Sequence, residues 1–93
     1  PSQRIALANG VSLDLTGTEL TLLEVLARKA GHPVPKDEIY QKVLGRAMQR
    51  YDRAIDVHVS AIRHKLVAVL DQQVAIESIR GVGYQLVIRN QAN

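Results

Sequence analysis

The sequence predicts an α+β domain in which three helices lie between an N-terminal and a C-terminal β-hairpin. Short apolar segments flank Asn9-Gly10 near the start, and similar segments flank a glycine-containing turn near the end. Between them, three stretches repeat their apolar residues at helical spacing. A chain of 93 residues fits one domain with a modest core, so we expect residues 1–93 to form a single domain.

Composition narrows the class of protein. Hydrophobic residues make up 46% of the chain, which favours a folded domain over disorder. There is no cysteine, so disulfides and thiolate metal sites are excluded. No apolar run approaches the ~20 residues that a membrane span needs, and no signal-peptide pattern is present. We therefore expect a cytoplasmic domain with no membrane contact, no metal and no cofactor.

The net charge of +3 is concentrated in residues 46–65. This segment holds five basic and two acidic residues, whereas the remaining seven basic and seven acidic residues balance. Such a concentration favours a polyanionic partner. On charge alone, a solvated basic surface explains the pattern equally well.

The first hairpin and the first helix follow from local signals. Residues 4–8 and 11–15 alternate partly between apolar and polar, and the Asn9-Gly10 pair is typical of a tight hairpin turn. Thr16 begins a capping box with Glu19. The apolar residues of this helix have helical spacing: Leu20, Leu23, Ala27 and Ala30, widened by Leu22 and Leu26.

Glycines and prolines in the middle of the chain mark where helices end. Gly31 is suited to end the first helix, and Pro33 and Pro35 prevent its continuation. A second helix is predicted over residues 36–44, with Gly45 as its stop and a polar loop over residues 45–51.

The third and longest helix is predicted over residues 52–70, with Asp52 as its N-cap. One side of it is wholly aliphatic and should be buried; it carries Ile55, Val59, Ile62, Leu66 and Val69. The opposite side carries Val57, Ser60, Ala61 and His64, with the cations Arg53, Arg63 and Lys65 around them.

This outward side is unusual for a solvated surface, which would carry acid–base pairs four residues apart. Short side chains let a helix approach the floor of the major groove, where an apolar residue such as Val57 can touch a thymine methyl group. The surrounding cations can then reach phosphates. The third helix is therefore predicted to enter the major groove of DNA.

Catalytic and metal-binding interpretations are weaker. Asp56, His58 and Ser60 are two residues apart, so they do not face each other on a helix and form no relay. His58 and His64 lie nearly two turns apart and cannot share a metal without a third element. Because His58 borders the buried side, we expect it to be a packed histidine. No enzyme activity is predicted.

The chain closes with two strand segments, residues 74–79 and 84–88, joined by the turn at 80–83. The glycines Gly81 and Gly83 permit a tight bend, and Arg80 at its base is suited to a minor groove beside the third helix. The apolar residues of this hairpin should pack on the helices: Ile76, Ile79, Leu86 and Ile88. The element order predicts a winged helix-turn-helix, with this hairpin as the wing.

Three segments carry a resemblance to a known family: LTGTELTLLEVLARKAGHPVPKDEIYQKVLG, DRAIDVHVSAIRHKL and IRGVGYQLV. The match spans residues 13–88 and resembles the DNA-binding effector domains of OmpR/PhoB-family bacterial response regulators, most closely a CpxR-like branch that responds to envelope stress. The pairing of a DRxxDxHxxxxRxKL helix with a terminal RGxGY makes the resemblance specific. Pro35 stands where a capping serine is common in the family.

The resemblance implies a transcriptional regulator of a two-component phosphorelay, with a receiver domain that is absent here and a sensor kinase upstream. Such domains bind tandem half-sites on double-stranded DNA as head-to-tail dimers. It implies base-facing positions and phosphate-contacting positions in the third helix and the wing. The resemblance and the charge pattern together give two sets of expected contacts. The residues expected to face bases are Val57, Ser60, Ala61 and His64. The residues expected to contact phosphates are Arg50, Arg53, His58, Arg63, Lys65, Ser78 and Tyr84.

The resemblance also implies that Arg80 reaches the minor groove and that the loop after the second helix touches RNA polymerase. Within that loop the expected contacts are Arg46, Ala47, Met48 and Gln49, with Arg46 and Met48 exposed. The alternative function is a winged-helix protein-interaction module without DNA binding. Such a module should expose a larger apolar patch.

Overall fold

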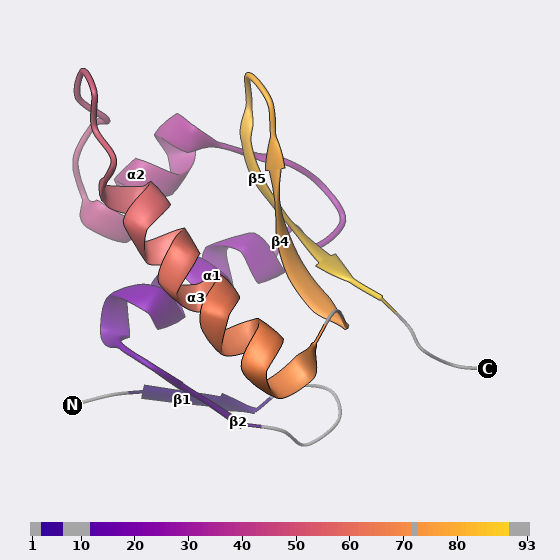
Figure 1. The fold of residues 1–93 in the computed structure, drawn as a ribbon. Coiled ribbons are helices and arrows are strands. Elements are labelled where there is room, and N and C mark those ends of the chain that lie inside the picture. The colour runs from indigo at the N-terminus through magenta and orange to yellow at the C-terminus, as the bar shows by residue number, and fades with distance from the viewer. Residues whose placement is uncertain (1–2, 7–11, 72, 90–93) are drawn as a thin grey trace.

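The computed structural model describes residues 3–6, 12–71 and 73–89, and Figure 1 shows their arrangement. Three helices stand between two antiparallel hairpins, as the sequence predicted. The elements in order are β1 Gln3–Ala6, β2 Ser12–Leu15, α1 Gly17–Ala27, β3 Val34–Pro35, α2 Lys36–Leu44, α3 Ala54–Leu70, β4 Val74–Ile79 and β5 Gly83–Ile88. No described helix combines the length and the apolar character that crossing a membrane requires.

The N-terminal hairpin pairs β1 with β2 from Gln3–Leu15 to Ala6–Ser12. Leu13 and Leu15 of β2 are buried against the helices, as alternation along a half-buried strand requires. The predicted turn at Asn9-Gly10 lies outside the described residues.

Helix α1 begins with the predicted capping box. The backbone N–H of Glu19 donates to Thr16 Oγ1 at 3.2 Å, and the backbone N–H of Thr16 donates to Glu19 Oε1 at 3.1 Å. The expected apolar stripe was partly wrong, because Ala27 is exposed and ends the helix. The buried side instead has the i, i+3, i+4, i+7 spacing of Glu19, Leu22, Leu23 and Leu26.

The short strand β3 was not predicted, because Pro33 and Pro35 indicated only the end of a helix. Val34 is fully buried and pairs with Tyr84 of β5, while Pro35 pairs with Gly83. Pro35 tolerates this place because β3 is an edge strand of the order β3-β5-β4. Helix α2 then follows with the predicted bounds, and Gly45 ends it with a left-handed φ of 71°.

Helix α3 begins at Ala54, two residues later than predicted, and its N-cap Arg53 makes no side-chain cap. The carboxylate of Asp52 still accepts the Ala54 N–H at 3.1 Å, but from one residue before the cap. The buried side consists of Ile55, Val59, Ile62 and Leu66. Val69 was wrongly placed there: it is 45% exposed, because the described core does not extend over the last turn of the helix.

The C-terminal hairpin has the predicted strands, and β5 additionally pairs with β3. Ile76 and Leu86 are buried, whereas Ile88 is 59% exposed and does not pack as expected. Gly83 has a different role from the predicted one. A Cβ there would lie 2.1 Å from the carbonyl oxygen of Val34, so this glycine permits close approach of β3. The bend itself uses Gly81, whose φ is +77°.

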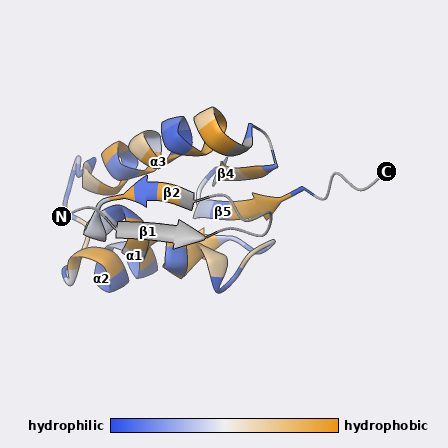
Figure 2. Ribbon diagram, turned by 90° about the horizontal axis from the view of Figure 1, so that it is seen from below, coloured by the Kyte–Doolittle hydropathy of each residue, from blue (hydrophilic) through white to orange (hydrophobic). Residues whose placement is uncertain are grey.

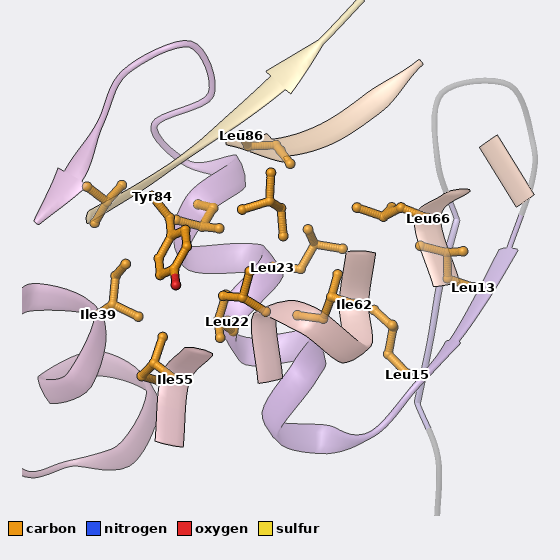
Figure 3. Close-up of a cluster of buried hydrophobic side chains, with 14 of the residues drawn as sticks. Leu13, Leu15, Leu22, Leu23, Ile39, Ile55, Ile62, Leu66, Tyr84 and Leu86 are labelled. Carbon is orange, nitrogen blue, oxygen red and sulfur yellow. The ribbon is translucent and has the colours of Figure 1, made fainter. Parts of the chain in front are cut away.

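One hydrophobic cluster joins these elements. In Figure 3, leucines of β2 and α1 meet aliphatic residues of α2 and α3 and the inner side of β5. Figure 2 shows α3 on one side of the molecule and α1 and α2 on the other, with hydropathy alternating around α3. The wing and the α2–α3 loop project at the end of the molecule away from the N-terminal hairpin (Figure 1).

Candidate nucleic-acid interface

The outward side of α3 presents the residue types that the sequence predicted. Val57 is 64% exposed although it is apolar, and Ser60 and His64 are also exposed. Ala61 is half-buried beside them. Because the helix rests on the core through its aliphatic side, this surface of short and polar side chains is held outward in a fixed orientation.

The wing presents Arg80 to solvent. The N–H of Val82 donates to the carbonyl of Ile79 at 2.9 Å and closes the turn, and the N–H of Lys36 donates to Val82 O at 2.9 Å. These bonds tie the turn to the start of α2. Arg80 is exposed, and within the described ranges it pairs with no acidic side chain. The guanidinium is therefore available to an external anion.

A charged cluster joins α3 to the base of the wing. Arg63 donates through Nε to Ile76 O at 2.9 Å and through Nη2 to Ser78 Oγ at 3.0 Å. Its guanidinium lies 5.7 Å from the ring centroid of Tyr84. The Tyr84 hydroxyl donates to Asp56 Oδ1. Burial first, and then this hydrogen bond, raise the pKa of Tyr84 to about 12. The predicted residues Arg63, Ser78 and Tyr84 therefore lie together.

Lys65 is held on the other flank of α3. Its Nζ lies 2.5 Å from Oε1 of Glu19, a carboxylate of α1 that is almost fully buried. Burial raises the pKa of Glu19, but the hydrogen bonds from Lys65 and from the Thr16 backbone outweigh it and lower the pKa below its usual value. His58 of α3 is half-buried. Lys65 thus braces α3 against α1.

The α2–α3 loop is organised by Asp52. Arg46 Nη1 lies 2.6 Å from Asp52 Oδ2, and the Gln49 N–H donates to the same oxygen at 3.2 Å. Arg46 also lies 5.6 Å from the ring centroid of the buried Tyr40, whose hydroxyl donates to Asp52 O. Arg46 and Met48 were expected to be exposed, but both are only partly exposed: Arg46 takes part in this network, and Met48 packs against the core.

Other loop residues do face solvent. Ala47, Gln49, Arg50 and Arg53 are exposed, and Arg50 stacks 5.3 Å from the ring centroid of Tyr51. Tyr51 is 86% exposed and has a φ of 60°, a left-handed conformation that is uncommon for a tyrosine. Two predicted phosphate contacts, Arg50 and Arg53, therefore precede α3 on the solvent side.

Asp52 leads to a testable pH dependence. The hydrogen bond from Arg46, followed by that from the Ala54 N–H, holds the pKa of Asp52 well below its usual range. Such a carboxylate stabilises the fold when ionised. As the pH falls, the unfolded chain takes up its proton first, near the ordinary value of about 3.9, and the contribution is lost.

We therefore expect Asp52→Asn to destabilise the domain above about pH 5, by an amount that shrinks as the pH falls below about 3.9. Urea unfolding of both proteins across this range measures the difference in free energy of unfolding. A difference that stays constant down to the lowest pH would contradict the assigned role of Asp52.

Two features of the site were missed from the sequence. Lys36 lies 3.2 Å from Asp56 Oδ1 and 5.8 Å from the ring centroid of Tyr84, and Asp56 itself was considered only as a catalytic candidate. No local pattern distinguishes either one, since the contacts join residues far apart in the sequence. In the part of the chain that the structure describes, no group of three or more potential ligands could hold a metal ion.

The three helices, the small sheet and the projecting hairpin define a winged helix-turn-helix domain. Four basic residues surround the outward side of α3 and are called the cationic rim below: Arg50, Arg53, Arg63 and Lys65. The chain belongs to the family of C-terminal domains of transcriptional regulatory proteins, whose model matches residues 10–86. Together with the CpxR relative and the CpxR structure described next, this match confirms the predicted resemblance to OmpR/PhoB-type domains of the CpxR-like branch.

Individual relatives agree with this assignment. The transcriptional regulatory protein CpxR of Escherichia coli is 41% identical over 87 residues, which cover 94% of this chain and 38% of CpxR. This chain therefore spans well under half the length of that relative. The DNA-binding domain of E. coli CpxR superposes with a TM-score of 0.78 at 34% identity, over 97% of this chain and 99% of that one.

A second structure is the DNA-binding domain of Klebsiella pneumoniae RstA in complex with an RstA box. It matches with a TM-score of 0.72 at 27% identity, over 84% of this chain and 77% of that one. The fold of this chain is therefore shared with a domain whose structure contains its DNA element.

Proposed function

We propose that this domain binds double-stranded DNA sequence-specifically, as the output domain of a transcriptional regulator in a two-component phosphorelay. The observation that carries the proposal is the exposed outward side of α3, where Val57, Ser60 and His64 face solvent. The wing adds the exposed Arg80, which has no acidic partner among the described residues. A helix with short side chains fits the major groove, and a hairpin with an exposed arginine fits a narrow minor groove.

Residues of the cationic rim supply the proposed phosphate contacts. Arg50 and Arg53 are exposed before α3, and Arg63 with Ser78 marks the base of the wing. His58 is half-buried on the flank. Lys65 and the Tyr84 hydroxyl are already bound to Glu19 and Asp56; they reach a phosphate only by exchanging these partners, so we assign them mainly to bracing.

The other proposed partners rest on the family. We propose that a receiver domain in cis and an upstream sensor kinase control this domain in the cytoplasm, and that it binds tandem half-sites as a head-to-tail dimer. For RNA polymerase, we keep the exposed loop residues Ala47 and Gln49 as the proposed contacts, because Met48 is partly buried against the core.

Selection of bound sites from a pool of random duplexes tests the proposed function. We expect enrichment of one sequence, present as two half-sites in the same orientation. Recovery of duplexes with no shared sequence, or no recovery at all, would contradict sequence-specific binding. The alternative function, a protein-interaction module without DNA binding, predicts that no duplex is recovered.

Val57 gives a more local prediction. We expect its side chain to contact a thymine methyl group, so replacing that thymine by uracil in the selected site should cost about 1 kcal/mol, the scale of one buried methyl group. The same replacement should cost nothing in Val57→Ala. Binding measurements with uracil at each thymine in turn provide the test, and a scan without any sensitive position would exclude the contact.

A further inference from the structure

Asp56 is an acidic residue on the helix that we place in the major groove, next to the outward Val57. A carboxylate there repels phosphate and lowers affinity for any DNA. Its contacts are nevertheless specific. Oδ1 accepts the hydroxyl of Tyr84 in β5 and lies 3.2 Å from Nζ of Lys36 in α2. One carboxylate thus connects the first turn of α3 to the wing sheet and to the start of α2.

The connection to the wing is continuous. Tyr84 is 7% exposed and pairs with Ser78 across the hairpin. Arg63, two turns further along α3, holds Ser78 at 3.0 Å. The wing strands are therefore fixed to α3 at two places, by Asp56 through the hydroxyl of Tyr84 and by Arg63 directly.

The contact of Asp56 with Lys36 affects the charge that Lys36 can offer to DNA. Lys36 lines a shallow hollow beside the wing turn together with Ser78 and Arg80. The Lys36 side chain is about one-third exposed beside Arg80, the proposed minor-groove contact. While it is paired with Asp56, its charge is partly neutralised, and it offers less to a phosphate of an arbitrary sequence.

We infer that Asp56 is a specificity-determining positioning residue: it fixes the wing relative to α3 through Tyr84, and it withholds Lys36 from phosphates of nonspecific DNA. The inference rests on the proposed function. This role explains why the acidic Asp56 lies within a cationic surface. Its carboxylate weakens binding to every duplex, but it increases the preference for the specific site over other DNA.

Two variants separate the two contacts. Tyr84→Phe removes the hydroxyl but keeps the ring beside Arg63 and Lys36, so it releases Asp56 from the wing without changing charge. Asp56→Asn keeps the size and an acceptor oxygen but releases Lys36. Asp14→Asn is the matched control, because Asp14 is an exposed carboxylate of β2 in the hairpin at the other end of the molecule.

The measured quantity is the ratio of affinities for the selected site and for a random duplex. Unfolding of part of the sample lowers both affinities equally, so a merely structural role leaves the ratio unchanged. We expect Tyr84→Phe to reduce the ratio about tenfold through weaker binding to the selected site, the order of one lost base contact. Asp56→Asn should reduce it through tighter binding to random duplex.

Salt titration tests whether the released Lys36 causes the tighter binding of Asp56→Asn to random duplex. For random duplex, the slope of log affinity against log salt should steepen by about 0.9 in Asp56→Asn, as expected for one additional phosphate contact, and stay constant in Tyr84→Phe and Asp14→Asn. An unchanged ratio in either test variant, or an unchanged slope in Asp56→Asn, would overturn the inference.

A measurement without DNA separates this inference from the proposed function. The pKa of Tyr84 is raised to about 12, and Asp56→Asn should lower it, which spectrophotometric titration of the tyrosines detects. If no duplex binds but Asp56→Asn lowers the pKa of Tyr84, the contact between Asp56 and Tyr84 is real. The proposed function is then wrong, and so is the specificity role that rests on it. If specific binding holds and the titration does not shift, only the inference fails.

Discussion

Gly83→Ala is expected to destabilise the domain by about 2–4 kcal/mol, at the upper end of what single substitutions usually cost. The added Cβ would lie 2.1 Å from the carbonyl oxygen of Val34 and 2.8 Å from the backbone nitrogen of Lys36. Both are backbone atoms, so no side chain can turn aside. The change must push β3 away from β5 and with it the N-terminus of α2.

Two further glycines calibrate this effect. Gly81→Ala adds a Cβ in open space at a φ of +77°, so only left-handed strain of about 1 kcal/mol applies. Gly17→Ala adds a Cβ in open space at the start of α1, and its φ is not in the left-handed region. It should be neutral or stabilise slightly. Urea unfolding of the three variants should rank them in that order of loss; equal losses for Gly83 and Gly81 would show that strand contact is not the cause.

Arg80→Ala is expected to weaken binding to the selected site by roughly 1–3 kcal/mol, and most where the flanking base pairs are A·T. A narrow A·T-rich minor groove has an enhanced negative potential, and Arg80 is exposed on the wing without an acidic partner among the described residues. Arg80→Lys should recover only part of the loss, because an ammonium group dehydrates less readily than a guanidinium.

The competing explanation is that Arg80 stabilises the hairpin. Thermal unfolding of Arg80→Ala distinguishes the two, together with binding to sites that differ only in their flanks. We expect an unchanged melting temperature and a loss that depends on the flanks. Earlier melting with an equal loss on A·T and G·C flanks would support the bracing role instead.

Local signals were sufficient for most of the fold. The capping box at Thr16, the left-handed Gly45 and the aliphatic side of α3 each depend on residues within one helix or turn. The strand β3 could not be predicted in this way. Its two residues are extended because they pair with Tyr84 and Gly83, about fifty positions later.

The same distinction applies to the site. The exposed side of α3 follows from helical periodicity, so Val57 and Ser60 were placed correctly from the sequence. Two ion pairs of the site were not predictable, because Lys65 joins Glu19 and Lys36 joins Asp56 across different elements. A count of cations treats all of them as available to DNA, whereas the structure shows that several are held by carboxylates.

We propose that this surface recognises one DNA sequence above others. Titration of the selected site and of a random duplex with the wild-type domain over a range of salt concentrations tests it directly. We predict that both affinities fall steeply with salt, through release of counterions from the phosphates, and that the selected site binds at least about 10³-fold more tightly at physiological salt. Equal affinities would contradict sequence-specific binding, and binding that does not depend on salt would contradict the proposed phosphate contacts.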